Sequence, residues 1–176
     1  MEAEGTFEDK DFILLFKKGV FLTKDNLIKR NWKVASKCCF CNKDETIQHL
    51  FSIFMWPDCH AVLFSFGIQP PASVSHLFGS WLRDFSLKLR KQLLVGAAAI
   101  CGAVWLSRNE AVVFSRKIFN SFLQVIFRGT YWIKFWSQFS KAEESFFLKN
   151  NCLLIEGRVL ELFARRGWNF MNHLSS

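Results

Sequence analysis

Three residues near the N-terminus of this sequence have types and spacing suited to binding a metal. Cys38 and Cys41 are separated by two residues, which places two thiols on one tight turn, and His49 follows on the next element. Thiolates and imidazole are the ligands that structural Zn²⁺ sites use, so the pattern predicts a zinc site. Such a site needs a fourth ligand. The candidates for that position are Cys59, His60 and Cys39.

The sequence around these cysteines resembles a known family. The segments that carry the resemblance are Leu22–Arg30, Lys37–Cys41 and Glu45–Phe51. They resemble the zinc-binding domain at the C-terminal end of reverse transcriptase polyproteins of plant non-LTR (LINE-type) retrotransposons. That family's pattern runs Leu-Thr-x-Asp-x-Leu-x-x-Arg, Cys-x2-Cys, an acidic residue, His-Leu-Phe and a further Cys. A weaker likeness to the helical tail of such polyproteins continues at Phe78–Leu82, Trp105–Glu110 and Phe122–Ile126.

The sequence departs from the family pattern at its last ligand. The resemblance implies a cysteine three residues after His-Leu-Phe, and Phe54 stands there. A phenyl ring cannot bind zinc, and Pro57 would interrupt a helix that carried Cys59 or His60 towards the site. We therefore predict that the zinc site is impaired unless another group takes the fourth position.

Basic residues flank the cysteine turn. The chain of 176 residues has a net charge of +8, and positive charge favours contact with phosphate backbones. An aromatic residue among basic ones also suits a single strand, by stacking and charge together. The resemblance and this charge together predict contact with RNA or DNA, whereas the charge alone fits a solvated face beside a core tryptophan. The residues concerned are Lys29, Arg30, Trp32, Lys33 and Lys37.

The pattern of apolar residues, caps and breaks predicts an all-α fold, with an irregular zinc-knuckle-like N-terminal region followed by a small helical bundle. We expect the first region over 1–68, a linker at 69–73 with Pro70-Pro71, and the helical region over 74–176. We expect a helix over 24–30 with Thr23 as its N-cap, and a second helix that Asp44 caps, that carries Glu45 and His49 and that ends near Pro57. Further helices are expected over 74–85, 86–115, 118–139 and 151–166. The segment 11–20 could be a short helix or a strand.

The longest apolar run, Leu93–Leu106, fits a buried core helix better than a membrane span, which needs roughly 20 residues. Small residues in this run also fit a helix that packs closely in a membrane.

The sequence lacks the motifs of the common catalytic sites. It has no Gly-rich phosphate loop, no Gly-x-Ser-x-Gly elbow and no aspartate pair of the kind that polymerases use for two metals. We therefore expect no enzymatic activity and no small-molecule substrate. Met1–Lys10 does not read as a secretory signal, and the six cysteines fit a reducing compartment, so we expect a nuclear or cytoplasmic protein.

Three functional hypotheses follow. The first is a non-catalytic accessory domain that contacts RNA or DNA, with the reverse transcriptase domain of the parent element as a further partner. The second is a degenerate retroelement remnant without biochemical activity. The third is an amphipathic helical protein that binds a membrane or a partner's helices, and the short apolar run argues against the membrane.

Overall fold

We describe the fold from a computed structural model. The structure describes residues 21–41, 43–52, 67–77, 79–112 and 122–166, together with Leu14, Lys18 and Leu63. These residues contain helices and no strand, with one isolated bridge between Lys37 and Asp44. The predicted all-α class is therefore confirmed for the described part. Its elements are α2 (Lys24–Lys29), α3 (Ile47–Phe51), α5 (Val74–Leu77), η2 (Trp81–Asp84), α6 (Leu87–Val112), α7 (Phe122–Trp136), η3 (Ser137–Phe139) and α8 (Ala142–Arg166).

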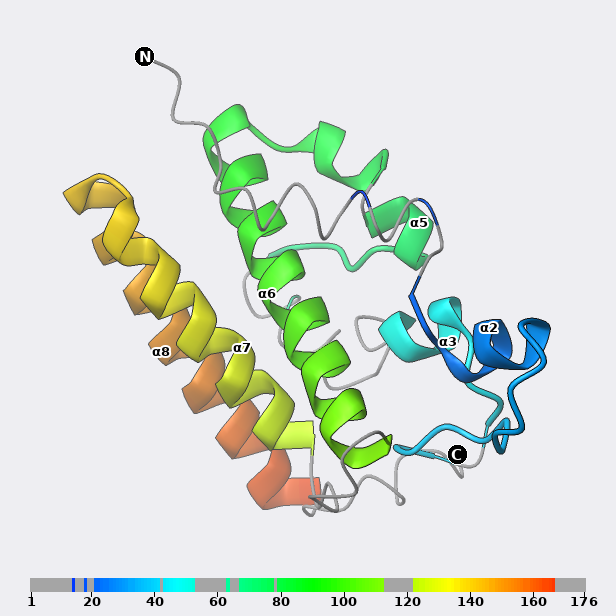
Figure 1. Ribbon diagram of the computed structural model, residues 1–176. Coiled ribbons are helices and arrows are strands. Elements are labelled where there is room, and N and C mark those ends of the chain that lie inside the picture. The colour runs from blue at the N-terminus through cyan, green and yellow to red at the C-terminus, as the bar shows by residue number, and fades with distance from the viewer. Residues whose placement is uncertain are drawn as a thin grey trace.

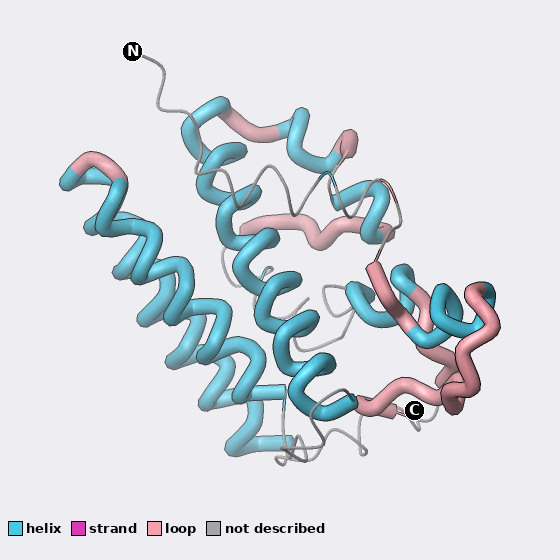
Figure 2. The backbone as a smooth tube through the Cα atoms, in the orientation of Figure 1, coloured by secondary structure: helices cyan, strands magenta, loops and turns pink. Residues whose placement is uncertain are grey.

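The long helix α6 is the centre of the arrangement. Figure 1 shows α7 and α8 side by side along one flank of α6, with α2 and α3 at its other flank. A backbone tube shows the same order, with loops in the cysteine region, before α5 and between the helices (Figure 2). Gly129 lets α7 come close to α6, because a Cβ atom there would lie 2.2 Å from Cδ1 of Ile100.

Helix α6 is buried in part, mostly through small side chains. Ala97, Ala98, Ala99, Cys101 and Ala103 are all buried, which supports the prediction of a core helix over this run. By length and composition α6 could also cross a membrane, at a mean hydropathy of 1.3. Core helices of water-soluble proteins meet the same criterion.

One hydrophobic cluster joins the cysteine region to the helices. Phe21 packs edge-on against Phe51 at 5.2 Å and against Trp105 of α6 at 4.9 Å between ring centroids. The same cluster contains Cys38 and Cys41. Residues from both sides of the break at 69–73 thus share a core, while the division into regions at that break stays a prediction.

The helix that carries His49 begins later than predicted. We expected Asp44 as its cap and Glu45 in its first turn, but Thr46 is the N-cap and its Oγ1 accepts a hydrogen bond from the His49 N–H. Asp44 instead pairs with Lys37, and Glu45 is buried against α6. Long-range pairing therefore overrides the local capping preference. Helix α3 ends at Phe51, and Pro57 lies outside the described residues.

The last helix is longer than predicted. It begins at Ala142 rather than near Asn151, directly after the short turn that follows η3. Glu143 and Glu144 lie in its first turn, where carboxylates interact favourably with the positive end of the helix dipole. The added turns allow α8 to pack along the whole of α7.

The other predicted helices agree with the structure more closely. Thr23 is the N-cap residue of α2, although its hydroxyl donates to Asp25 rather than capping a backbone N–H. The helix predicted over 74–85 is interrupted by a turn at Gly79 and Ser80, and η2 follows with the Trp81 indole donating to the Gln69 carbonyl at 2.7 Å. Helices α6 and α7 lie within their predicted ranges, and 11–20 falls almost wholly outside the described residues.

Candidate metal centre

The cysteine turn is held by backbone hydrogen bonds on both sides. The Cys38 N–H donates to the Lys43 carbonyl at 2.8 Å, next to the bridge between Lys37 and Asp44. Within the turn, the Phe40 N–H points at the Cys38 sulfur, 3.4 Å away. Such a bond favours the thiolate, because a backbone donor stabilises the negative charge that metal binding requires.

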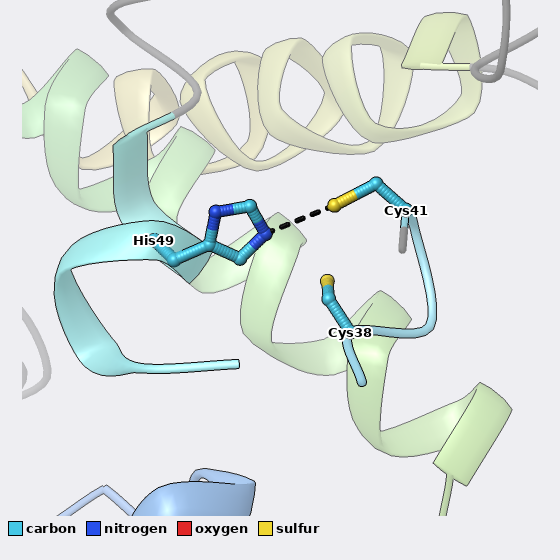
Figure 3. A group of neighbouring side chains, drawn as sticks. All are labelled: Cys38, Cys41 and His49. Carbon is cyan, nitrogen blue, oxygen red and sulfur yellow. Dashed lines mark hydrogen bonds between the residues drawn. The ribbon is translucent and has the colours of Figure 1, made fainter. Parts of the chain in front are cut away.

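Helix α3 brings His49 to the same place. Thr46 fixes the start of the helix, and Leu50 and Phe51 anchor its other face in the core. The imidazole Nε2 of His49 then lies 3.1 Å from the Cys41 sulfur. Figure 3 shows the ring and the two thiols pointing towards one another from the turn and from α3.

Cys38, Cys41 and His49 form a group whose ligand atoms all lie within 4.8 Å of one another. With Zn–S bonds of about 2.3 Å and Zn–N bonds of about 2.0 Å, neighbouring ligands of one Zn²⁺ ion lie ~3.5–4 Å apart. The donor set of two thiols and an imidazole is also the one that Zn²⁺ prefers. These residues therefore fit a zinc ion after only small adjustments.

The two thiols are held in their protonated form when no metal is bound. A hydrogen bond with Cys39 and burial together raise the pKa of Cys38 to about 12. Burial also raises the pKa of Cys41 above its ordinary value. A metal ion must therefore displace protons from both sulfur atoms as it binds.

The fourth ligand is not placed by the structure. Cys39 is exposed, and its sulfur lies within 4.8 Å of the Cys38 sulfur and of a Glu45 carboxylate oxygen. It does not join Cys41 and His49 in one group, so it would have to turn to complete the site. The other two candidates, Cys59 and His60, lie outside the described residues, as does Phe54, where the sequence departs from the family pattern. The fourth ligand thus stays a prediction.

A buried ion pair beside the cysteine turn was not predicted from the sequence. The Glu45 Oε1 atom accepts hydrogen bonds from Nη2 of Arg108 at 2.7 Å and from its Nε at 3.0 Å. Both side chains are almost fully buried. The available signal was an arginine at the end of the most apolar helix, which needs a buried acidic partner. Its partner is 63 residues away, so no local pattern could name it.

The predicted nucleic-acid-binding residues lie at the end of α2 and in the segment that leads from it to the cysteine turn, and all of them are exposed. Lys29 and Arg30 end α2, and Asn31 turns the chain with a φ of 63° before Trp32. The Trp32 side chain is 63% exposed, so it is not the core tryptophan of the alternative interpretation.

The basic side chains around Trp32 are exposed as well, and they differ in their partners. Lys29 pairs with Asp25, and Lys37 pairs with Asp44. Arg30 and Lys33 form no ion pair within the described part of the chain. These two positive charges therefore remain available to a partner.

Comparison with known proteins bears on this segment. A family model described as zinc-binding in reverse transcriptase matches residues 6–55. Residues 6–55 are thus similar to the zinc-binding segment of reverse transcriptases. The suggested resemblance to a reverse-transcriptase zinc-binding domain is thereby confirmed for residues 6–55, while the origin in a plant non-LTR element stays a prediction. No curated protein and no solved structure matches the chain.

The matched segment contains Cys38, Cys41 and His49, and it also contains Glu45. Arg108, the partner of Glu45, lies outside it, on α6. The zinc-binding segment is therefore tied to a helix that the family match does not include.

Proposed function

We propose that this chain is a non-catalytic accessory domain that uses a zinc-organised turn to hold single-stranded RNA or DNA. The observation that carries the proposal is Trp32, which stands exposed between Arg30 and Lys33 in the segment that leads to the cysteine turn. An exposed indole offers a stacking surface to a base, and the free cations can contact phosphates.

The zinc ion would have a structural role in this proposal. It would fix α3 and the cysteine turn, and the turn follows the segment from Lys29 to Lys37 directly in the chain. The family match supports zinc binding and is consistent with a reverse transcriptase domain as a second partner. The resemblance of the sequence implies that this domain belongs to a parent non-LTR retrotransposon of plant type. Such a domain would act inside the cell, where thiols remain reduced.

The first test measures zinc in purified, reduced protein. We expect about one zinc per chain, lost on Cys41→Ser. Phe54→Cys should raise the zinc affinity, because it supplies the thiolate that the family pattern has at this position. An affinity that Phe54→Cys leaves unchanged would mean that another group fills the fourth position. Absence of zinc in all three proteins would support a degenerate remnant instead.

The second test measures binding of a labelled single-stranded oligonucleotide by fluorescence anisotropy at several salt concentrations. Trp32→Ala should weaken binding about 5- to 100-fold, the effect of losing one base stack. Arg30→Gln with Lys33→Gln should lower the salt dependence by about 1.4 in log–log slope, because two phosphate contacts are lost.

Lys88→Gln with Lys91→Gln is the matched control, since both lysines are exposed on α6 away from the metal centre. It removes the same charge and should leave Trp32-dependent binding unchanged. Binding that falls equally in both double variants would indicate a general charge effect. Binding only to anionic vesicles would favour the membrane hypothesis.

A further inference from the structure

The buried pair of Glu45 and Arg108 connects the metal centre with the central helix. The Arg108 side chain is 2% exposed and that of Glu45 is fully buried. Arg108 also lies over the Trp105 ring, with its guanidinium carbon 5.4 Å from the centroid. Both guanidinium hydrogen bonds end on the same carboxylate oxygen, Oε1, and they hold that atom against α6. Helix α6 thus determines where the Glu45 side chain lies.

Glu45 in turn holds the segments that carry the ligands. Its N–H donates to the Ser36 carbonyl at 2.8 Å, two residues before Cys38, and its carbonyl accepts from the Asp25 N–H at 3.2 Å. Its Oε1 also accepts from the Lys24 N–H at 3.0 Å. The next residue, Thr46, caps the helix of His49. One residue therefore joins the cysteine turn, α2 and α3.

The Glu45 carboxylate also borders the cysteines directly. One of its oxygens lies within 4.8 Å of the sulfur atoms of Cys38 and Cys39. Its Oε2 is buried without a hydrogen-bond partner in the described part of the chain. Arg108 is the cation that compensates this charge, and a buried carboxylate without one would move towards water. That movement would displace the turn that holds Cys38.

We propose that Arg108 is a positioning residue of the metal centre, so that α6 forms part of the metal-binding unit. Arg108 acts through Glu45, which sets the relative placement of Cys38, Cys41 and His49. This inference rests on the proposed metal binding. It adds that a residue outside the matched segment 6–55 helps to determine the affinity for the metal.

The test uses the full chain and Co²⁺, whose absorption reports thiolate coordination. We compare the wild type with Arg108→Met. The variant should bind Co²⁺ at least ten-fold more weakly, with a changed thiolate absorption, because groups that orient metal ligands typically alter affinity by 10- to 100-fold. Circular dichroism on the same samples shows whether the helices remain.

Arg128→Met is the matched control. Arg128 forms a half-buried ion pair with Glu110 at 2.9 Å where α6 meets α7, and it contacts no ligand segment among the described residues. Its Co²⁺ affinity should stay within two-fold of the wild type. An equal loss in both variants would mean that affinity follows general helix packing, and this would overturn the proposal.

A second readout needs no metal. In the metal-free wild type, Ellman's reagent should react quickly with the exposed Cys39 and slowly with the buried Cys38 and Cys41. In Arg108→Met all three should react quickly. If the wild type binds no Co²⁺, the proposed zinc-dependent function fails, while these rates still show whether Arg108 holds the turn.

If Arg108→Met does not fold, the double variant Glu45→Gln with Arg108→Met tests the role of Arg108 instead. The double variant leaves no uncompensated charge buried at this pair. Weak Co²⁺ binding and fast thiols in the folded double variant support the proposal. The proposal would be overturned if Arg108→Met or the double variant folds, binds Co²⁺ with wild-type affinity and keeps slowly reacting thiols. It would also be overturned if the double variant folds only when Co²⁺ is added and then binds Co²⁺ with wild-type affinity.

Discussion

At the scale of single residues, the candidate site is a set of buried thiols whose protons compete with the metal. The pKa values of Cys38 and Cys41 are both raised above 9.0, the pKa of an ordinary cysteine thiol. Below about pH 8.5 both sulfur atoms are therefore protonated without metal. Two protons must leave for each ion bound, so acid favours the metal-free state and base favours the complex.

We predict that the Zn²⁺ affinity rises about 100-fold per pH unit between pH 6.5 and 8.5. Affinity is measured by competition with a chromophoric chelator whose own pH dependence is known. Proton release in a weakly buffered indicator solution should give about two protons per ion. Cys41→Ser should lower this number by one if it still binds. A pH-independent affinity would show that the thiolates are formed before the metal arrives.

The site's ligand chemistry could be predicted from the sequence, because Cys38, Cys41 and His49 are close in the chain and the structure brings them together. The residues that hold these ligands in place could not be predicted from the sequence. Glu45 was expected in a helical turn from the capping pattern around it, yet its position depends on Arg108, 63 residues later. A local pattern contains no information on such a partner, and the long-range ion pair outweighs the modest preference for a cap.

At the scale of elements, the helices were predicted correctly where the sequence has a long apolar run or a clear apolar face, and the start of α8, where charged residues stand, was misplaced. Helices α6 and α7 agree with their predicted ranges, whereas α8 begins well before the predicted start. Its first turns contain few buried side chains, and Leu148 and Cys152 are the first to enter the core. Phe146 and Phe147 are exposed and mark no buried face there, so the acidic pair Glu143 and Glu144 was the indication of a helix start.

The packing of α7 on α6 gives the prediction at this scale. Gly129→Ala should destabilise the protein by about 1–2 kcal/mol. The new Cβ atom would lie 3.3 Å from Cα of Ile100 and would collide with the end of its side chain. Overpacking costs about 1–3 kcal/mol, and the better helix propensity of alanine offsets up to about 1 kcal/mol. The measurement is the free energy of unfolding in urea.

Gly157→Ala is the control for this substitution. Gly157 lies in α8, and a Cβ atom there would meet nothing within 4 Å. Alanine should therefore stabilise the protein, by at most about 1 kcal/mol. If both substitutions stabilise the protein equally, α7 does not approach α6 as closely as described.

At the scale of the whole molecule, the metal centre and the helices share one interior. The aromatic contacts of Phe21 with Phe51 and Trp105 and the ion pair of Glu45 with Arg108 cross between the two predicted regions. Breaking either connection exposes apolar surface or leaves a buried charge alone. The boundary at 69–73 is a break in the sequence, and these contacts give a reason for the regions on either side to unfold together.

We therefore predict a single cooperative transition on heating the Co²⁺-loaded protein. The loss of thiolate absorption and the loss of helical circular dichroism should have the same midpoint, because each region would leave the other's core residues exposed. Trp105→Ala should lower both midpoints together. If the absorption disappears well below the helical transition, the metal centre unfolds as an independent unit, and the contacts across the boundary contribute too little free energy to couple it to α6.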